Sequence, residues 1–369
     1  MDYWIIGLLD RWKKLILLHA AKSIHREFLK RPHCSFIRCP AYGGISIRWE
    51  NFFPTRRPVI PLLHDSIAPL LLLFPLLLFS ACDKKAPKSS LTVPAFDGQA
   101  AYALLVKQCD FGPRVPGTPA HDSCRAFLVG ELQKYADRVA EQKFEEHLAT
   151  LSKTVKLANI IASFDMAATQ RILLCAHWDS RPWADQDPDT GKRKEPVLGA
   201  NDGASGVAVL LEVAKTLKRT PPPVGVDIIF FDGEDAGISG QSETYLAGSR
   251  YFAQTKDARF NPMMGILLDM VGDADLQIYK EENSVHYAGG VVDRVWSLAG
   301  RIGVAEFMPT AKHAVTDDHL PLLNTGIPVI DVIDFDYDHW HTTSDTPDKC
   351  SAQSLEKVGR VVLAAVYNP

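Results

Sequence analysis

The sequence lacks an excess of either charge, because 40 lysines and arginines stand against 44 aspartates and glutamates in 369 residues. A formal net charge of −4 provides no basic surface for a phosphate backbone, so we expect no nucleic-acid partner. The chain has no internal repeats and only seven cysteines, which excludes a small disulfide-stapled scaffold. With 46% hydrophobic and 23% charged residues it is neither disordered nor collagen-like, but an ordinary globular chain.

The sequence also lacks a convincing membrane-spanning run near its N-terminus. Residues 66–81 are apolar, but they are interrupted by prolines and are shorter than the roughly 20 residues that a spanning helix needs. Arg56 and Arg57 precede this run and two small residues end it, directly before Cys82, so residues 58–82 are typical of a secretory signal peptide. Its end resembles a bacterial lipoprotein signal, with Cys82 as the acylated residue of a periplasmic or membrane-anchored protein. A plain membrane anchor with an unimportant cysteine is the alternative.

The segments around this signal differ in character. Residues 1–57 are hard to interpret as mature structure, and we expect that the true start lies further downstream. Residues 83–96 are rich in Lys, Pro and Ser and indicate a flexible tether. Residues 97–369 are long enough for a single domain with a full core. This part contains four cysteines whose pairing the sequence leaves open, either as disulfides or as buried thiols: Cys109, Cys124, Cys175 and Cys350.

From about residue 97 onward, short β-branched runs alternate with longer runs of helical periodicity. This alternation predicts an α/β fold of three layers (αβα), with helices on both faces of a mostly parallel central sheet. The expected strands cover residues 157–164, 171–177, 226–232, 265–272 and 327–335. The expected helices cover residues 98–109, 119–136, 203–219, 292–303 and 351–367.

Imidazoles and carboxylates follow several of the expected strands. Because ligands bind outside the carboxyl ends of strands in such sheets, these side chains should converge on one rim. Imidazole nitrogen and carboxylate oxygen are both ligands of Zn²⁺, and a neighbouring unbound Glu can act as a general base. The residues concerned are His177, Asp179, Asp202, Glu234, Asp235, Asp269 and His341.

Taken together, these motifs resemble the zinc aminopeptidase superfamily, family M28, over roughly residues 97–369. The resemblance implies the fold of a zinc-dependent exopeptidase. The matching elements are His177-x-Asp179, the Gly199–Gly206 loop, Phe231-Asp232-Gly233-Glu234-Asp235, Leu268-Asp269, Asp318-His319 and the His341–Thr346 segment. The resemblance implies that Asp202, Asp235 and His341 bind one metal ion. It also implies that His177 and Asp269 bind a second ion together with Asp202. Glu234 would then be the general acid and base.

Three features resemble one branch of that superfamily, the glutaminyl-peptide cyclotransferases or glutaminyl cyclases. They are the Trp340-His341 pair, the double Asp at Asp317-Asp318, and the segment Phe111–Thr118. This branch uses a single zinc ion and converts the N-terminal Gln of peptides and proteins to pyroglutamate with release of ammonia. The resemblance therefore implies a zinc-dependent acyltransferase; an M28-type aminopeptidase with two zinc ions is the alternative, and a non-catalytic binding module is a third possibility.

On the cyclase interpretation, Glu234, Asp269 and Asp317 are the catalytic residues. Asp269 and Asp317 would hydrogen-bond to each other and to the substrate amide. Asp179 and His319 are expected to orient the residues that act directly. Trp340, Trp178 and Trp183 are expected to form the wall of the substrate pocket. Two residues keep simpler interpretations: Asp202 could be only a helix N-cap, and Asp317 only the first residue of a helix.

Overall fold

The computed structural model describes residues 91–369, and these form an α/β domain. The expectations for residues 1–57, for the signal at 58–82 with its Cys82, and for residues 83–90 of the tether lie outside the described residues. The first helix, α2 (Gly98–Cys109), begins close to the expected start of the domain, after Asp97 accepts a hydrogen bond from the amide of Ala100. Across residues 91–369, no helix has both the length and the apolar character needed to cross a membrane.

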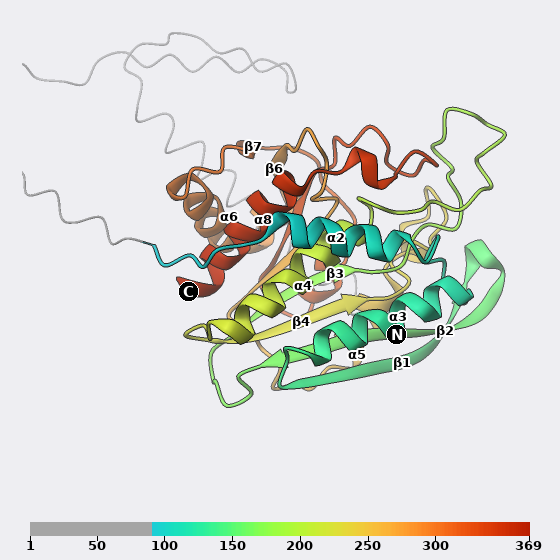
Figure 1. The fold of residues 1–369 in the computed structure, drawn as a ribbon. Helices are drawn as coiled ribbons and strands as arrows, with labels where there is room; N and C mark the ends of the chain where they lie inside the picture. Colours follow the sequence, from blue (N-terminus) through green and yellow to red (C-terminus); the bar gives the residue numbers. More distant parts are fainter. Residues whose placement is uncertain (1–90) are drawn as a thin grey trace, which may run out of the picture. The chain divides into compact units, whose positions relative to one another are not determined.

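A six-stranded sheet forms the centre of the domain, in the order β1-β2-β4-β3-β5-β8. Figure 1 labels the strands β1, β2, β4 and β3 of this sheet. Strands β4, β3, β5 and β8 are parallel, whereas β1 and β2 are antiparallel additions at one edge. The mostly parallel sheet confirms the predicted fold class. The strands are β1 (Arg138–Leu148), β2 (Lys153–Phe164), β3 (Arg171–His177), β4 (Gly225–Phe231), β5 (Met264–Asp269) and β8 (Val329–Ile333).

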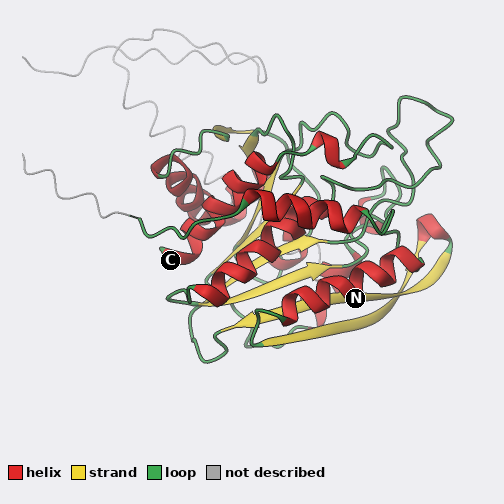
Figure 2. Ribbon diagram, in the orientation of Figure 1, coloured by secondary structure: helices red, strands yellow, loops and turns green. Residues whose placement is uncertain are grey.

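Helices cover both faces of this sheet (Figure 2). Side chains of β3 show the two-sided burial: Ile172 and Leu174 belong to one apolar cluster, whereas Leu173 and Cys175 belong to another. Such strands are continuous apolar runs because neither face meets water. The first cluster also takes in side chains from α2, α3 (Pro119–Gln133), α4 (Ala204–Arg219), α6 (Glu282–Arg301) and α8 (Ala352–Tyr367). The second includes Phe252 of α5 (Ala247–Thr255) and Leu322 of α7 (His319–Leu323).

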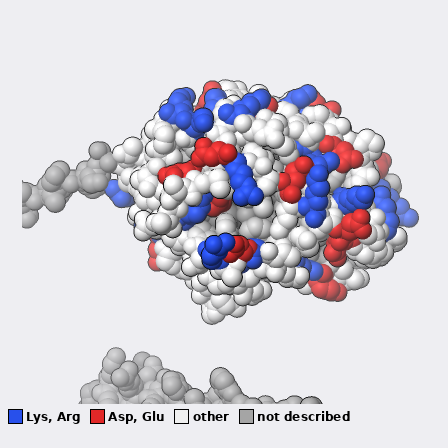
Figure 3. Space-filling view, turned by 90° about the horizontal axis from the view of Figure 1, so that it is seen from below, with Lys and Arg blue, Asp and Glu red and all other residues white. Residues whose placement is uncertain are grey.

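Smaller elements complete the domain. Strands β6 (Ile278–Lys280) and β7 (Phe307–Ala311) form a separate two-stranded sheet. Three 3₁₀ turns lie at Ala149–Leu151, Ser242–Thr244 and Pro347–Lys349. On the face drawn in Figure 3, basic and acidic side chains are interspersed rather than gathered into patches of one sign.

Several element bounds differ from those expected, for identifiable reasons. The expected strand at 265–272 ends at Asp269 because Met270 has a positive φ of 47°. Strand β8 begins only after Pro328, which cannot donate a ladder hydrogen bond. The expected helix at 292–303 begins ten residues earlier, at Glu282, where the Glu281 side chain accepts hydrogen bonds from two backbone amides.

Candidate active site

The predicted side chains converge at the carboxyl ends of the parallel strands. A cavity of about 350 Å³ lies there, and its walls come from the end of β5, from β8 and the loop after it, from the loop after β4, and from the segments before α4 and α7. Among the lining residues are Asp202, Glu234, Asp235, Asp269, Asp317, Trp340 and His341. Five of these residues, Asp202, Glu234, Asp235, Asp269 and His341, are among those that the sequence predicts at one rim. Asp317 and Trp340 were expected at the site from the resemblance to the cyclases instead, and His177 and Asp179 do not line the cavity.

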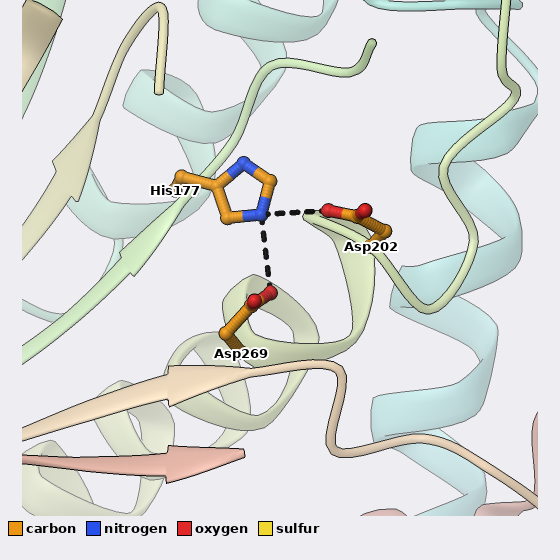
Figure 4. A group of neighbouring side chains, drawn as sticks. All are labelled: His177, Asp202 and Asp269. Atoms are coloured by element: carbon orange, nitrogen blue, oxygen red, sulfur yellow. Dashed lines mark hydrogen bonds and ion pairs between the residues drawn. The ribbon is translucent and has the colours of Figure 1, made fainter. Parts of the chain in front are cut away.

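His177, the last residue of β3, lies between two carboxylates (Figure 4). Its Nε2 is 3.1 Å from Oδ1 of Asp202 and 3.1 Å from Oδ1 of Asp269. Burial alone would lower the pKa of His177, but the hydrogen bonds that the imidazole donates to the carboxylates of Asp179, Asp202 and Asp269 raise that pKa well above its ordinary value. So many carboxylates around one imidazole require a balancing positive charge, which a proton or a metal ion can supply.

A second group shares Asp202 with the first. Nε2 of His341 is 3.2 Å from Oδ1 of Asp235 and 3.7 Å from Oδ2 of Asp202. Oδ2 of Asp235 is buried and has no hydrogen-bond partner. A buried carboxylate oxygen without a donor is costly unless a cation completes it, and two carboxylates with one imidazole suit Zn²⁺. The residues present therefore fit the zinc ion that the fold family implies.

The loop before α4 is shaped to present Asp202. Gly199 and Gly203 have φ values of 71° and 98°, and a Cβ at either position would collide with neighbouring backbone oxygen. The amides of Asn201 and Asp202 donate to the two carboxylate oxygens of Asp345 at 2.8 and 3.1 Å. The N-cap of α4 is Gly203, so the interpretation of Asp202 as a simple helix cap is wrong.

Asp179 organises the loop after β4. Its two carboxylate oxygens accept hydrogen bonds from the backbone amides of Glu234 and Asp235, at 3.1 and 3.3 Å. Oδ1 of Asp179 is also 3.6 Å from Nδ1 of His177. Asp179 thus contacts the potential ligand His177 and the backbone amides of Glu234 and Asp235, as expected of an orienting residue.

The surroundings shift the pKa values of the adjacent Glu234 and Asp235 carboxyls in opposite directions. Burial raises the pKa of Glu234 well above its ordinary value, with His177 opposing and Asp235 adding to the effect. Burial also acts to raise the pKa of Asp235, but His341 and Arg181 outweigh it and lower that pKa to about 2. Environments that separate two neighbouring carboxyls in this way suit a proton carrier beside a charged ligand.

The predicted hydrogen bond between Asp269 and Asp317 does not form within the described part of the chain. Oδ1 of Asp317 instead accepts from the amide of Asp318, and its Oδ2 has no hydrogen-bond partner. Asp317 gathers with His319 and Asp331 in a buried group of potential ligands. Helix α7 begins at His319 after its cap residue Asp318, so Asp317 is not merely the start of that helix.

His319 lies behind the cavity rather than in its wall. It is fully buried, and its Nε2 is 3.3 Å from Oε2 of Glu281, the residue that caps α6. The carboxylates nearest to His319 are therefore those of Glu281 and Asp331, whose Oδ2 is 3.9 Å from Nδ1, and the orienting role of His319 stays a prediction.

Of the three tryptophans expected at the pocket, only Trp340 lines the cavity. Its ring stacks on His341 with centroids 3.8 Å apart. The prediction for Trp178 is wrong: it is fully buried, stacks on His121 at 4.2 Å, and donates from Nε1 to the carbonyl of Ala158. Trp183 is 42% exposed and is not among the residues that line the cavity, so that prediction is also wrong.

Sequence reasoning missed several residues that hold the site together, namely Arg114, Arg181, Asp185, Tyr245 and Asp345. Arg181 and Asp185 follow the His177-x-Asp179 motif within one loop, which was the available signal. The cysteines Cys109, Cys124, Cys175 and Cys350 are all buried free thiols in the structure.

Comparisons with known proteins agree with this geometry. Residues 159–366 match the model for peptidase family M28. The chain is 26% identical over 281 residues to a glutaminyl-peptide cyclotransferase of Drosophila melanogaster, covering 68% of this chain and 75% of the fly protein.

Solved bacterial structures are more similar. A glutaminyl cyclase of Bacteroides thetaiotaomicron bound to N-acetylhistamine is 38% identical, with a TM-score of 0.73 over 75% of this chain and 100% of that one. A protein of the same organism described as a leucine aminopeptidase precursor is also 38% identical, with a TM-score of 0.74 over 76% of this chain and 100% of that one. The family model covers more than half of the sequence, and the chain therefore belongs to peptidase family M28.

Proposed function

We propose that this protein is a zinc-dependent glutaminyl-peptide cyclotransferase, which converts N-terminal Gln to pyroglutamate and releases ammonia. The observation that carries the proposal is the pairing of Glu234, whose pKa is raised by burial, with the Asp202–Asp235–His341 group in one cavity that Trp340 closes on one side. The similarity to glutaminyl cyclases across the domain supports the same activity.

Asp202, Asp235 and His341 would hold the zinc ion, which supplies Lewis-acid polarisation of the carboxamide oxygen and stabilises the developing oxyanion. Glu234 accepts a proton from the α-amino nitrogen of the substrate's N-terminal Gln. That nitrogen then attacks the side-chain carboxamide carbon of the same Gln. The bond from this carbon to the amide nitrogen then breaks, and Glu234 returns the proton to the departing ammonia. The ring closes with no oxidant or other co-reactant.

Asp269 and Asp317 are proposed to orient the carboxamide nitrogen. Burial raises the pKa of both carboxyls, with Asp317 adding to the effect on Asp269. Each can therefore carry a proton or accept a hydrogen bond from the substrate amide. Trp340 restricts the cavity, and exclusion of water favours cyclisation over hydrolysis.

The alternative activity is that of a two-zinc aminopeptidase. His177, Asp202 and Asp269 form a second group of potential ligands whose atoms lie within 4.8 Å of one another. The similarity to a protein described as a leucine aminopeptidase precursor supports this alternative. The metal count separates the two activities, since about one zinc ion per chain is expected for the cyclase and two for the peptidase.

The location proposed for the enzyme rests on the N-terminal sequence. We infer that residues 58–82 direct export, that Cys82 is acylated, and that residues 83–96 tether the domain in the periplasm or at a membrane. Mass spectrometry of the protein isolated from cells would show a mature chain that begins at lipid-modified Cys82. An intact N-terminus upstream of residue 58, or an unmodified Cys82, would contradict this.

The activity is tested with the purified protein loaded with zinc. It is incubated with a peptide that begins with Gln and with a matched peptide that begins with Leu, and both are followed by mass spectrometry. Loss of one ammonia from the Gln peptide, with the Leu peptide unchanged, is the expected result. Release of free N-terminal residues would instead identify an aminopeptidase, and no product with zinc bound would contradict both activities.

A further inference from the structure

The loop after β3 places two charged residues beside the proposed metal ligands. Arg181 is buried, with a side chain only 2% exposed, and its Nη1 donates to Oδ1 of Asp235 at 2.8 Å and to the Asp235 carbonyl at 3.1 Å. Nε and Nη2 of the same guanidinium donate to the two carboxylate oxygens of Asp185, each at 2.8 Å. One planar fork therefore joins the two carboxylates.

Asp185 in turn faces His341. Its Oδ1 lies 3.6 Å from Nδ1 of His341, while Nε2 of that ring lies 3.2 Å from Oδ1 of Asp235. The amide of Gln186 donates to the carbonyl of His341 at 3.2 Å, which fastens the same loop to the backbone of the histidine. Arg181, Asp235, His341 and Asp185 thus form a ring of four side chains.

Three contacts of this ring are within hydrogen-bond distance, and the fourth, between Asp185 and His341, is at ion-pair distance only. A separation of 3.6 Å is too long for a direct hydrogen bond. The Asp185 side chain is only 23% exposed, and Arg181 holds both of its carboxylate oxygens at 2.8 Å. Nδ1 of His341 is itself buried without a hydrogen-bond partner, and Asp185 is the carboxylate placed to accept from it.

The arrangement has a direct consequence for a metal ligand. A histidine that binds metal through Nε2 carries its proton on Nδ1, and a carboxylate at Nδ1 fixes this tautomer and the ring orientation. Arg181 contacts only Oδ1 of Asp235, which leaves the buried Oδ2 without a donor and free for an ion. Neither Arg181 nor Asp185 belongs to the groups of potential ligands around Asp202.

We propose that Arg181 and Asp185 are positioning residues of the metal centre: Arg181 holds the carboxylate of Asp235, and Asp185 orients His341 through Nδ1. The inference rests on the metal site of the proposed function. If Arg181 and Asp185 formed only a structural salt bridge, their substitution would change the stability of the metal-free protein and leave the zinc affinity unchanged.

The test compares Asp185→Asn and Arg181→Lys with the control Asp189→Asn. Asp189 lies on the same loop, is exposed, and makes only turn contacts such as that with the amide of Gly191. Zinc dissociation constants are measured on the full protein by competition with a chelator, and the metal-free proteins are compared by thermal unfolding. Asp185→Asn keeps the side-chain shape, so it decides the question even if Arg181→Lys folds poorly.

We expect zinc to bind about 10-fold more weakly, or weaker still, in Asp185→Asn and Arg181→Lys, with the Tm of metal-free Asp185→Asn equal to that of the control. Zinc affinities equal to that of Asp189→Asn would overturn the inference while leaving the proposed function intact. A wild-type protein that binds no zinc at all would overturn both.

Discussion

Two adjacent carboxyls, Glu234 and Asp235, are given different tasks by their surroundings. His341 and Arg181 lower the pKa of Asp235, whereas burial raises the pKa of Glu234. Glu234→Gln keeps the shape but cannot accept a proton, so we expect turnover to fall about 10²–10⁴-fold with zinc affinity unchanged. The measurement is kcat alongside a zinc titration, with the exposed Glu243→Gln as control. Loss of bound zinc in Glu234→Gln would show that Glu234 is a ligand instead.

Trp340 lines the cavity, whereas Trp178 packs in the core, so substitutions of the two should have different effects. Trp340→Ala removes a cavity wall, and we expect KM for a Gln peptide to rise roughly 10-fold with little change in stability. Trp178→Ala removes a fully buried ring and should lower the free energy of unfolding by about 3–5 kcal/mol. Steady-state kinetics and urea unfolding of both variants provide the comparison. An unfolding free energy for Trp178→Ala equal to that of wild type would contradict the core assignment.

At the scale of loops and helices, Arg114 explains the Phe111–Thr118 motif. The side chain is fully buried and donates to the carbonyls of Trp178, Leu198 and Gly199 at 2.9, 2.8 and 2.7 Å. It therefore ties the loop after His177 to the loop that carries Asp202. A lysine cannot span three carbonyls in this fork geometry.

We therefore expect Arg114→Lys to lower the free energy of unfolding by about 2 kcal/mol or more, because buried carbonyls lose their donors. Arg138→Lys at the exposed start of β1 is the control and should be close to wild type. Urea unfolding measures both. Equal stability of the two variants would show that the loops are held by other contacts.

Glu281, which caps the start of α6, makes a pH-dependent contribution to the free energy of unfolding. Burial would raise the pKa of Glu281, but hydrogen bonds from His319 and from the amides of Asn283 and Ser284 lower it to about 2. Because this folded pKa lies below the ordinary value, the unfolded state binds more protons as the pH falls. The stabilisation is thus complete above pH about 4.5 and is lost toward pH about 2.

Its size is on the order of 3 kcal/mol. In Glu281→Gln, we expect the free energy of unfolding to depend less on pH across that window, whereas the exposed Glu282→Gln should follow wild type. Urea unfolding at several pH values tests this. Parallel curves for wild type and Glu281→Gln would contradict it.

At the scale of the whole domain, apolar clusters cover both faces of the sheet, and the proposed metal ligands lie only at its rim. We expect chelation of zinc to lower Tm by mass action while leaving the far-UV circular dichroism unchanged. Metal analysis before chelation should give about one zinc ion per chain. Loss of helical signal on chelation would mean that the metal organises the fold, and two ions per chain would favour the aminopeptidase alternative.

The sequence was sufficient to predict the parallel strands of the central sheet, the helices α2, α3, α4 and α8, and the convergence of Asp202, Asp235, Asp269 and His341. Helix α5 and the first half of α6 were not expected. The parallel strands are continuous apolar runs, and their carboxyl ends necessarily meet at one edge. Strand β1 was missed because its pattern is mostly polar and it exists through pairing with β2, from Arg138 opposite Ser163 to Leu148 opposite Lys153.

Tertiary structure decided which neighbours act together. Trp178 follows His177 directly, and successive side chains of an extended chain point in opposite directions, so one lies at the site and the other in the core. The contact of Arg181 and Asp185 with Asp235 and His341 joins segments more than 50 residues apart. Local periodicity carries no information about such contacts, because they depend on how a loop folds back across the rim.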